Sequence, residues 1–216
     1  MVTVQLHGPA WFFGADASLT AFAAVIAFCV AVAALRVYRV TGEKKYAFFT
    51  GSFALLTLSY LARAVTDALL EQLIITVPST MTGMVFYFGY VSHILLALAA
   101  YLLLVIITHK ITDVRVILLL FLTLIPGMLL SGSYFLSFYG LSAIFLAFVT
   151  FSYYQNYRNV CKAAACMVFI AFLLLTLSQV QFLLESLHAY WYVSAHITQA
   201  VGYLVLLFAL LRTLFK

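Results

Sequence analysis

Charged residues are scarce in this chain of 216 residues. Only 8% of the residues are Asp, Glu, Lys or Arg, whereas 67% are hydrophobic, and the mean hydropathy is +1.17. Soluble domains carry about 25% charged residues. The composition therefore excludes a water-soluble globular protein and indicates a chain that is embedded in lipid.

Cysteine and proline are also rare, with three residues of each, and the short motifs of common enzyme classes are missing. The chain has no HExxH zinc motif, P-loop, nucleophile elbow or dinucleotide-binding fingerprint. We interpret Cys29, Cys161 and Cys166 as reduced thiols, because the spacing of the last two is only a weak metal signal. We therefore expect no catalytic residues and no disulfide framework.

Long apolar runs dominate the sequence. An α-helix rises 1.5 Å per residue, so about 20 apolar residues cross about 30 Å of hydrocarbon. Seven runs are candidates for such helices: 17–38, 46–70, 82–108, 115–132, 136–154, 163–185 and 189–211. The connections between them leave no room for a soluble domain. We predict an all-α integral membrane protein with seven transmembrane helices, which form a single membrane domain over residues 1–216 in the cell membrane.

The basic residues predict the orientation of these helices. Ten of the eleven fall at one end of the predicted bundle: Arg36, Arg39, Lys44, Lys45, Lys110, Arg115, Arg158, Lys162, Arg212 and Lys216. The acidic residues Asp16, Asp67, Glu71 and Glu185 gather at the other end. By the positive-inside rule, the N-terminus is outside and the C-terminus is cytoplasmic. The net charge of +5 is thus a topology signal, and we expect no nucleic-acid partner.

The sequence also suggests an internal repeat. At an offset of 119 residues, eleven identities occur between positions 18 and 59, and they include the run Leu55–Ser59, which matches Leu174–Ser178. We predict a three-one-three arrangement of parallel repeats about an axis along the membrane normal. The repeat halves are about 14–110 and 133–216, and the helix at 115–132 links them.

The three-one-three layout resembles that of sugar transporters of the SWEET and PQ-loop type. Their Pro-Gln dipeptides are missing, since the prolines are Pro9, Pro78 and Pro126. Seven helices also resemble microbial rhodopsins, but the last helix has no lysine in its membrane interior to bind retinal. No family is assigned on these grounds.

Several helices place their most polar residues at a similar predicted depth. Arg63 lies 18 residues beyond Lys45, and His93 lies 17 before Lys110. Gln179 and Gln181 lie 17 and 19 residues beyond Lys162, and His196 lies 16 before Arg212. All of these are about 25 Å from the cytoplasmic boundary. Ser59 and Gln199 border this polar layer.

Polar side chains that face lipid are costly, so these residues should face the bundle interior. Arg63 and Asp67 are spaced i,i+4 and can form an ion pair. The candidate ligand-binding residues are Arg63, Asp67, His93, Gln179, His196 and Gln199. Two other interpretations remain open: Arg63 extends outward to the headgroups, or the histidines are neutral and only lock helix packing.

Three functions compete. The first is transport of a small polar or anionic solute, in which His93 and His196 bind the solute or exchange protons. The second is b-type haem binding for electron transfer, with His93 and His196 as the axial metal ligands and Gly89 and Gly202 admitting the macrocycle. The third is a non-catalytic sensor or a membrane subunit of a larger complex. The predicted partners are the lipid bilayer, a small polar solute and, optionally, further copies or a membrane-complex partner.

Overall fold

The computed structural model describes residues 9–12, 14–76, 79–129 and 133–214. Within these ranges all regular structure is helical, which confirms the all-α prediction. The elements are η1 (Ala10–Phe12), α1 (Ala15–Thr41), α2 (Lys44–Thr76), α3 (Ser79–Thr108), α4 (Val114–Leu129), α5 (Tyr134–Val160), α6 (Ala163–Leu183), η2 (Leu184–Ser186) and α7 (Tyr190–Leu214). Residues 130–132 of the fourth predicted span, and Lys216, lie outside the described residues.

Each of the seven predicted runs falls on one helix, but the helices are not equal in length. Six of them are long and apolar enough to cross a membrane. The exception is α4, which has 16 residues and is therefore about 24 Å long. This is shorter than a hydrocarbon layer of about 30 Å. Six of the seven predicted spans thus fall on helices that are long and apolar enough to cross a membrane, whereas α4 is a shorter apolar helix over its described residues. The seven-span topology stays a prediction.

The outer surface of the bundle is rich in large apolar side chains. Phe28, Leu58, Phe148 and Phe208, from four different helices, are each more than half exposed. Soluble monomers rarely expose apolar surface on this scale, whereas lipid covers it without cost. Together with the six long apolar helices, this surface indicates a multi-pass helical membrane protein.

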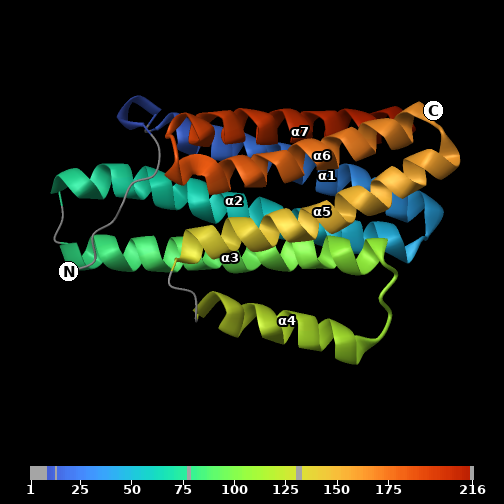
Figure 1. Ribbon diagram of the computed structural model, residues 1–216, viewed down its shortest axis with the longest axis horizontal. Coiled ribbons are helices and arrows are strands. Elements are labelled where there is room, and N and C mark those ends of the chain that lie inside the picture. The colour runs from blue at the N-terminus through green and yellow to red at the C-terminus, as the bar shows by residue number, and fades with distance from the viewer. Residues whose placement is uncertain (1–8, 13, 77–78, 130–132, 215–216) are drawn as a thin grey trace.

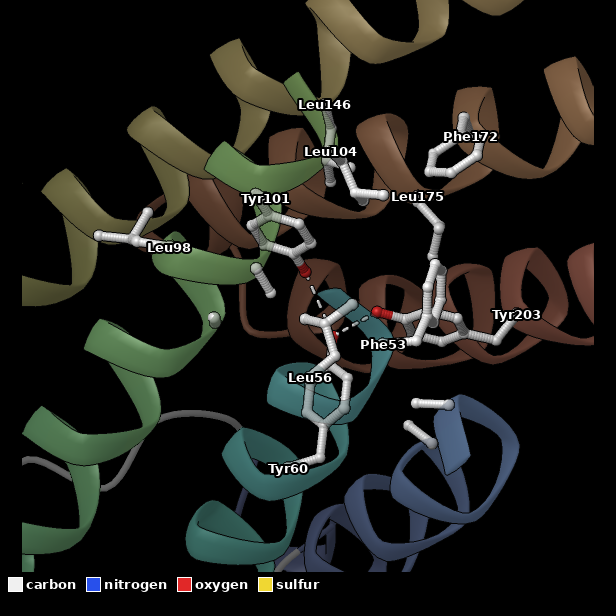
Figure 2. Packing of buried hydrophobic residues seen from close by; sticks show 14 of the residues in the cluster. Phe53, Leu56, Tyr60, Leu98, Tyr101, Leu104, Leu146, Phe172, Leu175 and Tyr203 are labelled. Atoms are coloured by element: carbon white, nitrogen blue, oxygen red, sulfur yellow. Dashed lines mark hydrogen bonds between the residues drawn. The ribbon is translucent and has the colours of Figure 1, made fainter. Parts of the chain in front are cut away.

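Six helices pack in a closed ring. Along the chain, α1 contacts α2, α2 contacts α3, α3 contacts α5, α5 contacts α6, and α6 contacts α7, which returns against α1. Helix α4 lies outside this ring, beside α3 and α5 (Figure 1). The ring encloses fully buried side chains such as Phe53, Leu98, Leu146 and Phe172 (Figure 2).

Small residues let neighbouring helices approach closely, as is common in membrane bundles. Helix α1 buries an alanine-rich face made of Ala23, Ala24, Ala27, Ala31, Ala33 and Ala34. Between α2 and α3, a Cβ atom added to Gly89 would lie 1.8 Å from Thr66 Oγ1. This close approach brings Ser59 of α2 against His93 of α3 in the interior.

Helix α5 begins 119 residues after α1 begins and ends 119 residues after α1 ends, which is the offset seen in the sequence. Both helices end in a left-handed cap, at Gly42 (φ 68°) and at Cys161 (φ 49°). The backbone N–H of each cap donates to the carbonyl of an equivalent tyrosine, Tyr38 or Tyr157. The internal repeat, and the superposition of its two halves by a rotation, stay predictions.

The predicted basic ends lie together. The connections from α1 to α2, from α3 to α4 and from α5 to α6 lie at the same end of the bundle as the end of α7 (Figure 1). These segments carry Arg39, Lys44, Lys110 and Lys162. One end of the bundle is therefore strongly basic, and the assignment of this end to the cytoplasm stays a prediction.

We expect the basic end to be protected from a membrane-impermeant maleimide in intact cells. The exposed native Cys161 lies at this end, so it should react only after the cells are permeabilised. As the matched control, a cysteine at position 188, placed in a chain without the three native cysteines, should react in intact cells. Labelling of Cys161 in intact cells would contradict the predicted orientation.

Candidate functional site

Arg63 lies inside the ring of helices, and only 5% of its surface is exposed. Its Nη1 donates to the hydroxyl of Tyr139 on α5 at 3.3 Å, and its Nη2 donates to the hydroxyl of Tyr192 on α7 at 3.0 Å. The guanidinium therefore connects α2 with α5 and α7. Because Arg63 is buried among these helices, the interpretation in which it reaches the headgroups does not describe this structure.

The predicted ion pair between Arg63 and Asp67 is present but loose. Arg63 Nε lies 3.6 Å from Asp67 Oδ2, a distance too long for a hydrogen bond. The other carboxylate oxygen of Asp67 accepts a hydrogen bond from Tyr90 on α3. The Tyr192 hydroxyl also donates to Asp16 Oδ2 at 3.3 Å. Arg63 is thus held mainly by neutral phenols, and Asp67 compensates its charge from one side.

His93 is held at one edge of its ring by Ser59. The Ser59 hydroxyl donates to the His93 carbonyl oxygen at 2.8 Å and lies 2.7 Å from His93 Nδ1. His93 Nδ1 also lies 3.2 Å from the Ser59 carbonyl oxygen. His93 Nε2, at the other edge of the ring, is buried and has no hydrogen-bond partner among the described residues.

Tyr60 is the centre of a buried hydrogen-bond network. Its hydroxyl lies 2.7 Å from that of Tyr203 on α7 and 3.3 Å from that of Tyr101 on α3, as Figure 2 shows. Gln199 Nε2 donates to the same hydroxyl at 2.7 Å. One phenol oxygen therefore joins three helices and sets the position of the Gln199 amide.

These polar groups surround a small buried cavity. Its volume is about 10 Å³, close to the smallest space that holds one water molecule. Its walls are formed by Tyr60, Arg63, His93, Tyr101, Phe138, Tyr139, Gln179, Phe182 and Gln199. Three of these residues, Arg63, His93 and Gln179, have a buried polar atom, Nε, Nε2 and Oε1 respectively, without a hydrogen-bond partner among the described residues.

The structure brings together some of the predicted site residues and separates another. Arg63, His93, Gln179 and Gln199 all line the cavity, and Asp67 reaches it through Arg63. His196 is buried, but it does not line the cavity. Its ring packs in an aromatic cluster with Phe12, Tyr192 and Phe182, and the Phe182 ring stands edge-on to it at 5.0 Å.

A haem does not fit between His93 and His196. Phe182 lines the cavity next to His93 and packs against His196, and a cavity the size of one water molecule cannot hold a macrocycle. The space beside Gly89 is filled by Thr66, and a Cβ atom on Gly202 would lie 3.1 Å from Leu175. In the described part of the chain, no group of three or more His, Cys, Asp or Glu residues is placed to hold a metal ion.

The aromatic walls of the cavity were not among the predicted site residues. The chain contains 14 tyrosines and 20 phenylalanines, so a single aromatic residue carries little information. One signal does mark two of the missed residues: Tyr101 and Tyr203 each lie nine residues before a basic residue, Lys110 and Arg212. This equal depth corresponds to the observed contact of both hydroxyls with Tyr60.

The residues that line this cavity come from five helices, α2, α3, α5, α6 and α7. The contribution of α5 consists of two aromatic residues. The chemistry of this polar centre is that of a buried cation surrounded by neutral hydrogen-bonding groups. Such a centre can bind a small solute. No protein-family model matches the sequence, and comparisons with curated proteins and with solved structures found no match.

Proposed function

We propose that the polar centre binds a small anionic or polar solute and that the protein carries this solute across its membrane. The observation that supports this most is the charge of the cavity wall. Arg63 contributes a positive charge, whereas the other lining residues are aromatic or carry neutral polar groups. Asp67 contacts only the Nε side of Arg63, at 3.6 Å. An anion in the cavity would be attracted to the Nη side of the guanidinium, which Asp67 does not contact.

The enclosure of the centre also supports a carrier. Arg63 and the cavity lie within the bundle, and a buried polar centre in a membrane bundle marks a functional site or pathway by default. A site lined by buried residues of five helices fits a solute site inside a carrier. Because the cavity is the size of about one water molecule, any solute larger than a small ion requires the helices to separate during transport.

The arrangement of the helices supports the same proposal. In many carriers the solute binds near the interface between two repeat halves. Here the cavity is lined by α2 and α3 of the first predicted half and by α5, α6 and α7 of the second. Rocking of one half against the other would open the cavity alternately toward each side. The haem function has no comparable support, because the space between the histidines is filled.

The test is flux of small monovalent anions into liposomes that contain the purified protein. We expect radiolabelled chloride, nitrate, formate or lactate to enter faster than into protein-free liposomes for at least one of the four anions. Arg63→Gln should lower this rate at least tenfold, which corresponds to the loss of about 1.4 kcal/mol of binding, and Arg63→Lys should retain part of it.

Arg39→Gln is the matched control, because Arg39 is exposed at the end of α1 and its replacement removes the same charge away from the cavity. Its flux should equal that of the unmodified protein. The elution volume in gel filtration shows whether each variant is folded. If none of the four anions enters faster than in protein-free liposomes, the proposal fails for this class of solute.

A further inference from the structure

We infer that His93 binds a proton together with the anion, so that the protein carries an anion and a proton as a pair. This inference rests on the function proposed above and assigns its coupling ion. It depends on three features: the hydrogen bonds of Nδ1, the free Nε2 and the position of Arg63 in the same cavity wall.

The hydrogen bonds with Ser59 determine which nitrogen of His93 carries the hydrogen. The Ser59 hydroxyl has one hydrogen, and it donates this hydrogen to the His93 carbonyl oxygen at 2.8 Å. The Ser59 carbonyl oxygen lies 3.2 Å from Nδ1 and can only accept. Nδ1 is therefore the donor in both contacts. In the neutral ring, Nε2 then presents a lone pair, which is able to take up a proton.

The groups around His93 decide when this proton can bind. The charged and titratable residues that line the same cavity are Arg63 and Tyr60 on α2, Tyr101 on α3 itself and Tyr139 on α5. The facing polar residues of α6 and α7 are the neutral amides of Gln179 and Gln199. Asp67, the carboxylate beside Arg63, is bonded by Tyr90 and pairs with Nε. Arg63 is therefore the cation that opposes a proton on His93.

A bound anion offsets the repulsion between Arg63 and a proton on His93. With the cavity free of anions, a proton on Nε2 would place two positive charges in the wall of one small buried cavity, where like charges repel strongly. An anion between the two groups attracts both charges. Anion binding therefore favours protonation, and by thermodynamic reciprocity protonation favours anion binding to the same degree. The affinity for the anion should rise as the pH falls.

Uptake driven by a proton gradient tests this coupling. Liposomes containing the protein are clamped electrically with potassium and valinomycin, and uptake of chloride, nitrate, formate and lactate is measured in turn with and without an acidic outside medium. We expect the acidic medium to accelerate uptake at least fivefold, after subtraction of the rate in protein-free liposomes. In His93→Gln this acceleration should disappear, while exchange of labelled for unlabelled anion remains measurable.

His188→Gln is the matched control, since His188 is exposed two residues before α7 begins, and it should retain the acceleration. Should His93→Gln not fold, calorimetry of the unmodified protein with the same four salts, in two buffers of different ionisation enthalpy, counts the protons taken up per anion. The expected number is close to one. A value near zero overturns the inference.

The outcomes separate the two proposals. Anion uptake that ignores the proton gradient overturns the role of His93 and leaves anion transport intact; the free Nε2 then faces a structural water only. Acceleration that persists in His93→Gln assigns the proton to another group and also overturns the inference. A complete lack of uptake of all four anions by the unmodified protein overturns transport of this class of solute, and the coupling with it.

Discussion

Replacing Arg63 by methionine should lower the free energy of unfolding by about 3 kcal/mol, although methionine suits a membrane interior well. Removing one member of a buried ion pair leaves an uncompensated charge, which costs about 3–5 kcal/mol in proteins. Asp67 would keep its hydrogen bond from Tyr90, but Oδ2 would lose its cationic neighbour. Tyr139 and Tyr192 would also lose the donor that ties α5 and α7 to α2. The loss can be measured by denaturant titration in detergent micelles, followed by circular dichroism.

A double-mutant cycle separates the ion pair from the rest of this loss. Asp67→Asn preserves the shape of the side chain and an oxygen that accepts from Tyr90, but it leaves Arg63 without its carboxylate. The double variant Arg63→Met with Asp67→Asn should lose less stability than the sum of the single variants, by about 0.5–3 kcal/mol. Exact additivity would show that the pair at 3.6 Å does not interact.

An exposed ion pair in the same chain provides the control for this cycle. Lys45 and Glu43 form a salt bridge, but their side chains are 58% and 51% exposed. Solvent screens such pairs, which contribute about 0–1 kcal/mol. Glu43→Gln should therefore change stability by less than about 1 kcal/mol. A loss as large as that of Arg63→Met would mean that the assay reports helix ends rather than the buried centre.

Much of the architecture could be predicted because the length of a membrane helix is set by the thickness of the hydrocarbon. The predicted range 163–185 differs from α6 (Ala163–Leu183) by two residues at its end, and the other ranges also fall on helices. The linker was less predictable. The range 115–132 is as apolar as its neighbours, but apolar composition does not show whether a helix packs inside a ring or, like α4, beside it (Figure 1).

The depth of the polar residues was more predictable than their direction. The rise of 1.5 Å per residue places Arg63, His93 and Gln179 at one level, and all three line the cavity. Rotation is harder, because one residue turns a helix by about 100°. His196 and Gln199 are separated by three residues on α7, but only Gln199 lines the cavity, whereas His196 packs against aromatic rings. Predicting this difference requires the contacts of α6 and α7, which residue spacing does not contain.

Tyr60→Phe should lower the free energy of unfolding by about 2 kcal/mol or more, although it removes a single oxygen atom and leaves the packing of the ring unchanged. That oxygen is the hydrogen-bond partner of Gln199 and Tyr203, both at 2.7 Å, and of Tyr101 at 3.3 Å. A buried donor without a partner costs about 1–3 kcal/mol. Hydrogen bonds between membrane helices often contribute only about 0.6 kcal/mol each, because the unfolded helices find other partners. The expected loss in the free energy of unfolding is therefore large only because three groups share the Tyr60 oxygen.

Tyr101→Phe is the matched comparison for this prediction. It makes the same chemical change in a buried residue of the same network, but the contact with Tyr60 that it removes is the longer one, at 3.3 Å. Its loss should stay below about 1 kcal/mol. The two variants also differ in their expected effect on transport. Tyr60→Phe releases the Gln199 amide at the cavity wall and should slow anion flux, whereas Tyr101→Phe leaves Gln199 bonded to Tyr60. Equal losses in the two variants would show that the network is a set of independent contacts and that Tyr60 does not organise the cavity.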